Sequence, residues 1–256
     1  MSVNLKVSTI GKGKQLVFLH GWGVNSGVWE PLLSILKDSF CITTIDLPGY
    51  GLNQQNMPQD YNLHSIAQLV GQHVPSNSTL IGWSLGGLIA QQIALDFPMK
   101  LAQLVLVCSS PKFAKDDEWP GIDPKVLDFF MLQLANDFNK TLDRFLAIQA
   151  MGSPCARQDI KTIKQAVQSH PAPAKVALVA GLEMLNNVDL RAQIKELQLP
   201  FRLFLGGLDT LVPEGLKAAM TKLAPQIEVE VLSKVSHAPF ISTPQDFAIR
   251  LQKALI

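Results

Sequence analysis

The sequence lacks an apolar run long enough to cross a membrane, and we expect no leader of the secretory kind. None of its uninterrupted apolar stretches approaches the roughly 18 residues that a membrane-spanning helix needs. Residues 1–10 alternate polar and apolar side chains, as edge strands do, and contain no apolar core of signal-peptide length. We therefore expect a cytoplasmic protein that has no contact with membranes.

Charge and cysteine are also scarce. Charged residues make up 17% of the 256 residues, and the formal net charge is +1. A nucleic-acid-binding protein needs a concentrated basic surface, so this balance argues against a nucleic-acid partner. The three cysteines, Cys41, Cys108 and Cys155, are odd in number, and the first two fall in or beside apolar runs. We expect buried free thiols in a reducing compartment, and no cysteine nucleophile, because none lies in a turn with a recognisable base.

Motifs for metals and phosphates are missing as well. No group of residues has the spacing of a metal site, and no glycine-rich loop has the pattern that binds phosphates. Internal repeats and low-complexity tracts are absent too. We expect no metal and no cofactor.

Short apolar runs alternate with segments of helical spacing in both end regions of the chain. Runs typical of buried strands cover residues 16–19, 41–45, 101–107, 201–205 and 227–232. Helical spacing occurs near residues 28–36, 63–74, 87–97 and 214–223 and again from 244 onward. Strands that are apolar on both faces and alternate with helices predict an α/β fold with a mostly parallel central sheet flanked by helices.

The middle of the chain breaks this alternation. Between residues 111 and 188 we find no convincing buried strand, and prolines and glycines separate four amphipathic segments, at about 124–136, 138–150, 156–169 and 174–186. We predict one α/β core, formed by residues 1–110 and 189–256, with residues 111–188 inserted as a helical cap.

The motif Gly82-Trp83-Ser84-Leu85-Gly86 has the Gly-x-Ser-x-Gly spacing of a nucleophile elbow. In such an elbow, a sharp turn between a strand and a helix holds a serine above the sheet. Small residues are needed there because the turn packs its backbone against neighbouring elements. The alternative, a glycine-rich turn with a structural serine, is weakened by the predicted strand before the motif and helix after it.

An activated serine needs a base to accept its proton and an acid to orient that base. Of five histidines, only His237 follows a late strand, at the sheet edge where we expect Ser84. Asp209 follows the strand at 201–205, and the order Ser84, Asp209, His237 is that of α/β-hydrolases. Asp46 also ends a strand but precedes the serine, and Asp209 could instead be a loop cap.

The other histidines have simpler interpretations. His64, His73 and His170 fall in or at the end of helical segments and read as ordinary surface or boundary residues, whereas the glycines beside His20 suggest a loop-shaping role. An oxyanion site would use the backbone N–H groups of Leu85 and Trp22. The Trp22 indole could simply form a pocket wall.

Four motifs together resemble those of the α/β-hydrolases: His20-Gly21-Trp22-Gly23, Gly82-Trp83-Ser84-Leu85-Gly86, Gly206-Gly207-Leu208-Asp209 and Ser236-His237-Ala238-Pro239-Phe240. Segments of the predicted cap, 117–122, 144–152 and 156–159, resemble more narrowly the pimeloyl-[acyl-carrier protein] methyl ester esterases of biotin synthesis. This resemblance extends over nearly the whole chain.

The resemblance implies a serine carboxylesterase that releases methanol from a pimeloyl methyl ester held by acyl-carrier protein. It implies a catalytic triad of Ser84, Asp209 and His237, with Trp22 and Leu85 at the oxyanion. Trp22, Ser84, Leu85 and His237 would also be substrate-binding residues. The substrate channel would add Phe145, Leu146, Ala147, Ile148 and Gln149.

The same resemblance implies contacts between acyl-carrier protein and four basic cap residues, Lys140, Arg144, Arg157 and Lys161. Lys140 and Arg144 are four residues apart, as are Arg157 and Lys161, so the members of each pair share a helical face. Residues 138–175 carry six basic against two acidic side chains, a net +4 that would suit an acidic partner. A solvated helix face is the alternative. We expect a monomer.

Two other functions stay open at the level of sequence. One is a broader short-chain carboxylesterase or thioesterase that uses the same triad. The other is a hydrolase-fold ligand sensor with little turnover, against which a complete triad argues.

Overall fold

The computed structural model describes residues 3–168 and 170–255, and within these ranges seven strands form one sheet in the order β1-β3-β2-β4-β5-β6-β7. The strands are β1 (Val7–Ile10), β2 (Lys14–Leu19), β3 (Phe40–Ile45), β4 (Ser78–Trp83), β5 (Leu101–Val107), β6 (Phe201–Gly206) and β7 (Glu228–Leu232). Only β1 is antiparallel to its neighbour, β3, and every other pair is parallel. The predicted α/β fold, with a mostly parallel sheet and an N-terminal edge strand, is confirmed.

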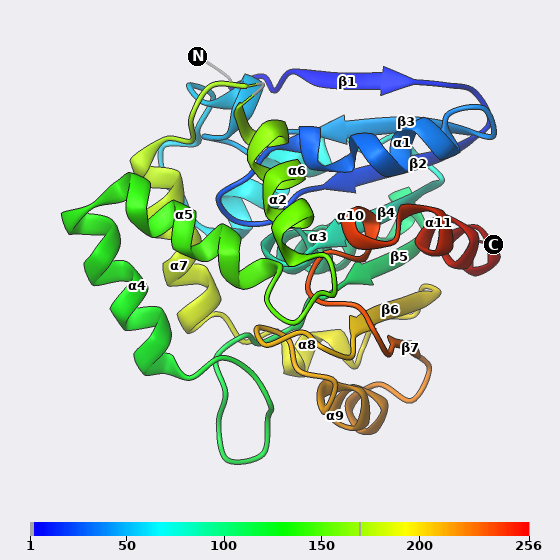
Figure 1. Ribbon diagram of the computed structural model, residues 1–256. Helices are drawn as coiled ribbons and strands as arrows, with labels where there is room; N and C mark the ends of the chain where they lie inside the picture. The colour runs from blue at the N-terminus through cyan, green and yellow to red at the C-terminus, as the bar shows by residue number, and fades with distance from the viewer. Residues whose placement is uncertain (1–2, 169, 256) are drawn as a thin grey trace.

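Helices cover both faces of this sheet. Successive strand side chains point to opposite faces, so Val17 and Leu19 of β2 join one buried cluster while Leu16 and Phe18 join the other. The first cluster is covered by α2 (Leu63–Gly71), α3 (Leu85–Asp96) and α9 (Leu216–Leu223). The second is covered by α1 (Glu30–Leu36), α10 (Pro239–Ser242) and α11 (Pro244–Ala254). In Figure 1, α1 lies in front of the sheet and α2 lies behind it. Three short 3-10 helices, η1 (Ser26–Trp29), η2 (Gly51–Asn53) and η3 (Pro98–Lys100), lie in the connections.

Residues 111–188, which follow β5, form four helices in the described ranges: α4 (Pro124–Asn136), α5 (Phe138–Gln149), α6 (Ala156–Gln168) and α7 (Lys175–Asn187). We call residues 111–188 the cap segment. Local sequence sets two of the helix starts, because the side chains of Asp123 and Asp137 accept hydrogen bonds from the first-turn N–H groups of Lys125 and Lys140. Figure 1 shows α4, α5 and α7 on the side to which β2 and β3 point, which is the carboxyl edge of the parallel strands.

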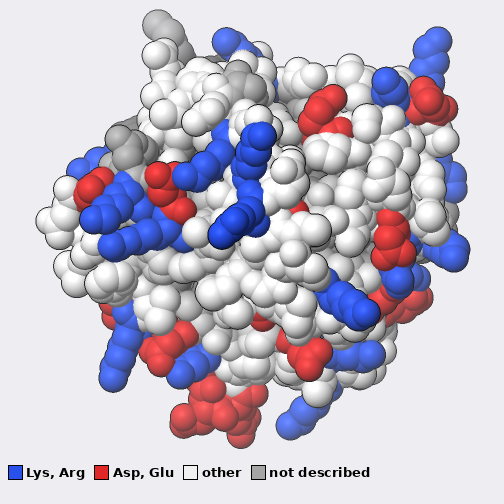
Figure 2. All heavy atoms as spheres, in the orientation of Figure 1, with Lys and Arg blue, Asp and Glu red and all other residues white. Residues whose placement is uncertain are grey.

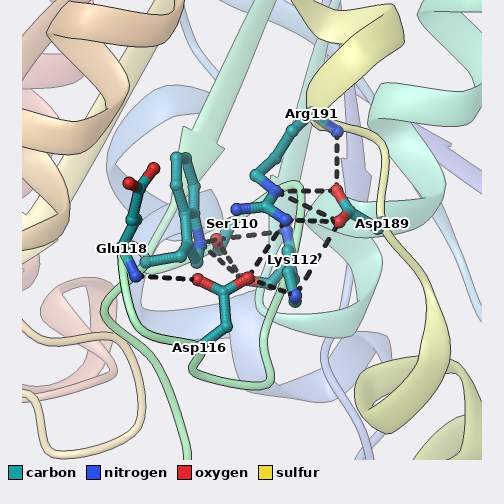
Figure 3. A network of polar contacts seen from close by, with 7 residues as sticks. Ser110, Lys112, Asp116, Glu118, Asp189 and Arg191 are labelled. Carbon is teal, nitrogen blue, oxygen red and sulfur yellow. Dashed lines mark hydrogen bonds and ion pairs between the residues drawn. The ribbon is translucent and has the colours of Figure 1, made fainter.

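The two ends of the cap segment are tied together (Figure 3). Arg191, at the start of α8 (Arg191–Ile194), pairs with Asp189 at 2.7 Å and with Asp116 at 3.1 Å, and its guanidinium lies 5.2 Å from the Trp119 ring centre. Lys112 pairs with Asp116 at 2.6 Å. The points at which the chain leaves and re-enters the sheet region are therefore adjacent in space.

The expectation of buried thiols is wrong for two of the three cysteines. All three are free, but only Cys108 is buried, whereas Cys41 is half-buried and Cys155 is exposed. Cys41 lies at the start of β3, where the strand is still partly open to solvent, and Cys155 lies in the turn before α6. Within the described ranges, no helix combines the length and the apolar character needed to span a bilayer.

Candidate active site

Ser84 lies between the last residue of β4 and the first residue of α3, in the left-handed region of backbone space with φ +54°. Two glycines make this turn possible. A Cβ on Gly82 would lie 2.5 Å from the Gly86 carbonyl oxygen, and one on Gly86 would lie 2.3 Å from the His20 carbonyl oxygen. Only hydrogen fits at either position, so the strained conformation of the serine is held by close backbone packing.

Asp209 lies in the loop after β6 and is buried. One carboxylate oxygen, Oδ1, accepts hydrogen bonds from the N–H groups of Leu211 at 2.9 Å and Val212 at 3.0 Å. The other, Oδ2, lies 2.7 Å from His237 Nδ1. Both oxygens are therefore occupied, and the carboxylate has one orientation.

His237 lies in the loop after β7 and is almost fully buried. Because the Asp209 carboxylate accepts, Nδ1 of the neutral ring carries the proton and Nε2 is left as the acceptor. Within residues 3–168 and 170–255, Nε2 has no hydrogen-bond partner, so Ser84 Oγ is not yet bonded to it. Catalytic hydrogen bonds of this kind often tighten only once substrate is bound.

Sequence reasoning missed two contacts that hold the His237 backbone. Trp83, the residue before the serine, donates its indole N–H to the His237 carbonyl oxygen at 2.8 Å. The His237 N–H donates to the carbonyl oxygen of Gln149, at the end of α5, at 3.3 Å. Trp83 stands inside the elbow motif, but a tryptophan there gives no sign of its partner 154 residues away.

The aspartate and the histidines to which the sequence analysis gave no catalytic role make other contacts. The Asp46 side chain accepts from the N–H groups of Ser26 and Leu52, so it is a buried loop cap. His64 is 68% exposed beside Asp96. His73 lies just past α2 and accepts from the Leu5 N–H.

Trp22 and Leu85 both lie beside the serine. Leu85 is the first residue of α3, and a Cβ on Gly21 would lie 3.1 Å from Ser84 Cβ, which places the Trp22 loop against the nucleophile. Among the described residues, the Trp22 backbone N–H has no hydrogen-bond partner. The Trp22 indole instead donates to the Leu178 carbonyl oxygen of α7 at 2.8 Å.

The residues of the predicted channel segment, Phe145 to Gln149, lie on two different faces of helix α5. Phe145 is buried with its ring centre 4.5 Å from that of Trp22, and Leu146 and Gln149 are also buried. The side-chain amide oxygen and nitrogen of Gln149 have no hydrogen-bond partner among the described groups. Ala147 and Ile148 instead line a surface cavity of about 520 Å³ between α4 and α5, together with Phe129 and Arg144. The structure thus separates these two positions from the buried part of the segment.

The four basic cap residues lie on two neighbouring helices. Lys140 and Arg144 are exposed on α5, and Arg157 and Lys161 are exposed on α6. None of the four forms an ion pair within the described part of the chain. Figure 2 shows lysine and arginine side chains gathering over the region that α5 and α6 occupy in Figure 1, with acidic side chains among them.

Cys108 lies close to Asp209 and His237, with possible ligand atoms of the three within 4.8 Å of one another. Burial and the negative charge of Asp209 raise the pKa of the Cys108 thiol well above its usual value. A metal ligand must be a thiolate, and Asp209 and His237 already bond to each other. This donor set therefore fits a neutral packed thiol better than a metal site.

Known proteins share both the sequence and the shape of this chain. A profile of the alpha/beta hydrolase fold family matches residues 14–244. The chain is 48% identical to the pimeloyl-[acyl-carrier protein] methyl ester esterase of Pseudoalteromonas atlantica, over 99% of this chain and 98% of that protein. It is 46% identical to the protein of the same name from Photobacterium profundum, over 98% of each chain. An esterase structure from Exiguobacterium antarcticum superposes with a TM-score of 0.86 at 23% identity, covering 97% of this chain and 94% of that one. The chain therefore belongs to the α/β-hydrolase fold family and, within it, to the family of the pimeloyl-[acyl-carrier protein] methyl ester esterases.

Proposed function

We propose that the chain is a serine carboxylesterase that hydrolyses the methyl ester of a pimeloyl group carried by acyl-carrier protein, and that Ser84 is its nucleophile. The observation that carries this proposal is the buried Asp209–His237 hydrogen bond of 2.7 Å beside the strained Ser84 turn. Relatives of 46% and 48% identity bear the name of that activity.

The first half of the reaction forms an acyl-enzyme. Ser84 Oγ attacks the ester carbonyl carbon while His237 Nε2 takes the hydroxyl proton. Asp209 keeps the imidazole in the required tautomer and stabilises the imidazolium that forms. The N–H groups of Leu85 and Trp22 donate to the oxyanion of the tetrahedral intermediate. When that intermediate collapses, His237 returns the proton to the departing methoxide, and methanol leaves.

The second half repeats this chemistry with water. His237 takes a proton from a water molecule, which attacks the acyl-enzyme carbonyl, and Ser84 Oγ leaves with that proton. The product is a free carboxylate on a pimeloyl chain that is still joined to its carrier. The buried part of the channel segment, next to Trp22, would contact the acyl chain, and the basic residues of α5 and α6 would meet the acidic carrier.

The test is to follow both ends of a carrier-borne pimeloyl methyl ester. We expect catalytic release of methanol with the thioester intact, and no release in the Ser84→Ala variant. Release of the carrier thiol with the methyl ester intact would instead identify a thioesterase. Release of one equivalent of methanol per protein, without further turnover, would identify a sensor. Equal kcat/KM on carrier-borne and free esters would identify a broad esterase.

A further inference from the structure

His20 is fully buried, and both of its ring nitrogens make hydrogen bonds. Nε2 lies 2.9 Å from the backbone nitrogen of Leu47, and Nδ1 lies 2.8 Å from the carbonyl oxygen of Gly21. A backbone N–H can only donate, so Nε2 accepts. Nδ1 of the neutral ring therefore carries the proton and donates it to the Gly21 oxygen.

The surroundings favour this neutral form. Burial lowers the pKa of His20, against smaller raising effects of the Asp46 charge and of the hydrogen bond to Gly21, and His170 adds a small lowering effect. Asp46 Oδ1 lies 4.0 Å from Nε2, but the Asp46 carboxylate already accepts from the N–H groups of Ser26 and Leu52. The ring thus has one tautomer and one orientation.

The hydrogen bond from His20 to the Gly21 carbonyl oxygen also affects the direction of the next N–H group, that of Trp22. In a trans peptide, the carbonyl oxygen and the following N–H point in opposite directions from one rigid plane, and the described residues contain no cis peptide bond. Fixing the direction of the Gly21 oxygen therefore fixes the direction of the Trp22 N–H. That N–H has no partner among the described groups, and the loop that carries it packs against Ser84.

We infer that His20 is a positioning residue: through the Gly21 carbonyl it aims the Trp22 N–H at the oxyanion that forms on the ester. The inference rests on the proposed serine mechanism. It gives His20 no contact with substrate, and it makes transition-state stabilisation, not substrate binding, depend on Nδ1.

Two substitutions separate the two ring nitrogens. The side-chain nitrogen of Asn takes nearly the place of Nδ1, so His20→Asn keeps a donor for Gly21 and loses the contact with Leu47. The longer side chain of Gln reaches the place of Nε2, so His20→Gln keeps an acceptor for Leu47 and loses the donor for Gly21. Loss of a whole oxyanion donor costs about 100- to 1,000-fold in kcat, so a misaimed one should cost roughly 10- to 100-fold.

The assay uses a simple water-soluble short-chain ester, so its outcome does not depend on whether the carrier protein is the true partner. We expect His20→Gln to lose roughly 10- to 100-fold in kcat with KM nearly unchanged, and His20→Asn to keep most of the parent kcat. Affinity for an alkyl boronic acid, which forms a tetrahedral anion on the serine, should fall in parallel with kcat. His64→Gln is the exposed control and should change neither.

Equal losses in the two variants, or losses that follow the fall in Tm, would overturn the inference and leave His20 with a structural role. A second measurement needs no variant: nitrogen-15 NMR of the parent protein should show the His20 proton on Nδ1. A proton on Nε2 would contradict the inference. If Ser84→Ala keeps the activity toward the simple ester, the proposed function itself fails, and that result is distinct from either outcome for His20.

Discussion

At the residue scale, the candidate site depends on a few positions where the backbone is tightly constrained. Ser84 is held at φ +54° by the close backbone packing at Gly82 and Gly86. The His237 ring bonds to Asp209, and its backbone carbonyl accepts a hydrogen bond from Trp83. Each constraint fixes the direction of one reacting group before substrate arrives. Such preorganisation is the main source of catalytic stabilisation in acyl transfer.

Removing the proposed nucleophile tests the roles assigned to these residues. Ser84→Ala should lower kcat/KM by something on the order of a million-fold, because only binding and oxyanion stabilisation remain. His237→Ala should be of similar severity. Ester hydrolysis and thermal unfolding of each variant give the measurement. His64→Ala, at a 68% exposed side chain, is the control and should be nearly silent. Activity of Ser84→Ala within tenfold of the parent would rule out the serine mechanism.

The buried neutral His20 predicts a pH dependence of stability. Burial lowers the His20 pKa in the folded protein below its value in the unfolded chain, which is about 6.5. Below that pH the unfolded chain binds a proton that the folded protein refuses, so the free energy of unfolding should fall as the pH drops. The slope should approach about 1.4 kcal/mol per pH unit and should be absent above neutrality.

Urea unfolding of the parent and of His20→Asn between pH 8 and 5.5 measures this effect. The stability difference between the two proteins should shrink or reverse as the pH falls, because asparagine does not titrate. The same comparison with His64→Asn controls for general acid destabilisation. A difference that stays constant with pH would show that His20 takes up its proton in the folded state.

At the scale of secondary structure elements, α5 joins the protein surface to the site. Its outer face carries Lys140 and Arg144, its inner face places Phe145 against Trp22, and its last residue, Gln149, accepts the hydrogen bond of the His237 N–H. An acidic carrier docked on α5, as proposed, would therefore sit one helix away from His237, the proposed catalytic base.

A four-residue variant tests whether this surface serves a partner. Exposed charge pairs are worth roughly 0.2–1 kcal/mol each. Replacing Lys140, Arg144, Arg157 and Lys161 together by alanine should therefore cost about 1–4 kcal/mol in binding an acidic carrier, or about five-fold to several hundred-fold in kcat/KM. Rising salt should have the same effect on the parent, because the Debye length falls from about 10 Å at 0.1 M to about 3 Å at 1 M.

The control for this variant removes the same charge from other surfaces of the molecule. Lys37, Lys217, Lys222 and Lys253 are exposed and lie outside the cap segment. Their replacement should leave the carrier-borne rate unchanged, and neither variant should slow the hydrolysis of a small soluble ester. If the cap variant loses the same factor on both substrates, these charges support the fold of the cap and not a partner.

The elements were largely predictable from sequence because their signals are local. Buried strands such as β5 are mostly apolar, with Gln103 its one polar residue, and Pro98 ends the helix that follows the elbow. The turn at Ser84 and the contact between Asp209 and His237 were predictable because a motif there combines a turn with chain order, and the catalytic roles of the three residues stay a prediction. The exposure of Cys155 and the outward position of Ala147 were not, because they depend on how α4, α5 and α6 pack in three dimensions. The bond from Trp83 to His237 joins residues 154 positions apart and leaves no local pattern.

At the scale of the whole molecule, the sheet brings together residues that are far apart in the chain. Parallel strands β4, β6 and β7 end at the same edge, so the loops that follow them place Ser84, Asp209 and His237 there. The cap segment then covers this edge, and all three side chains are no more than 5% exposed. A site shielded from water strengthens every electrostatic interaction in it.

The central claim is that carrier-borne ester is cleaved through an acyl-enzyme on Ser84, and the most direct test is to trap that species. The protein is mixed with pimeloyl methyl ester on acyl-carrier protein, quenched in acid during turnover and digested, and the peptides are weighed by mass spectrometry. The account predicts a carrier-linked pimeloyl adduct on the peptide that contains Ser84, and no adduct in the Ser84→Ala protein. Turnover in which the acyl group is found on another residue, or in which Ser84→Ala releases methanol at the parent rate, would contradict it.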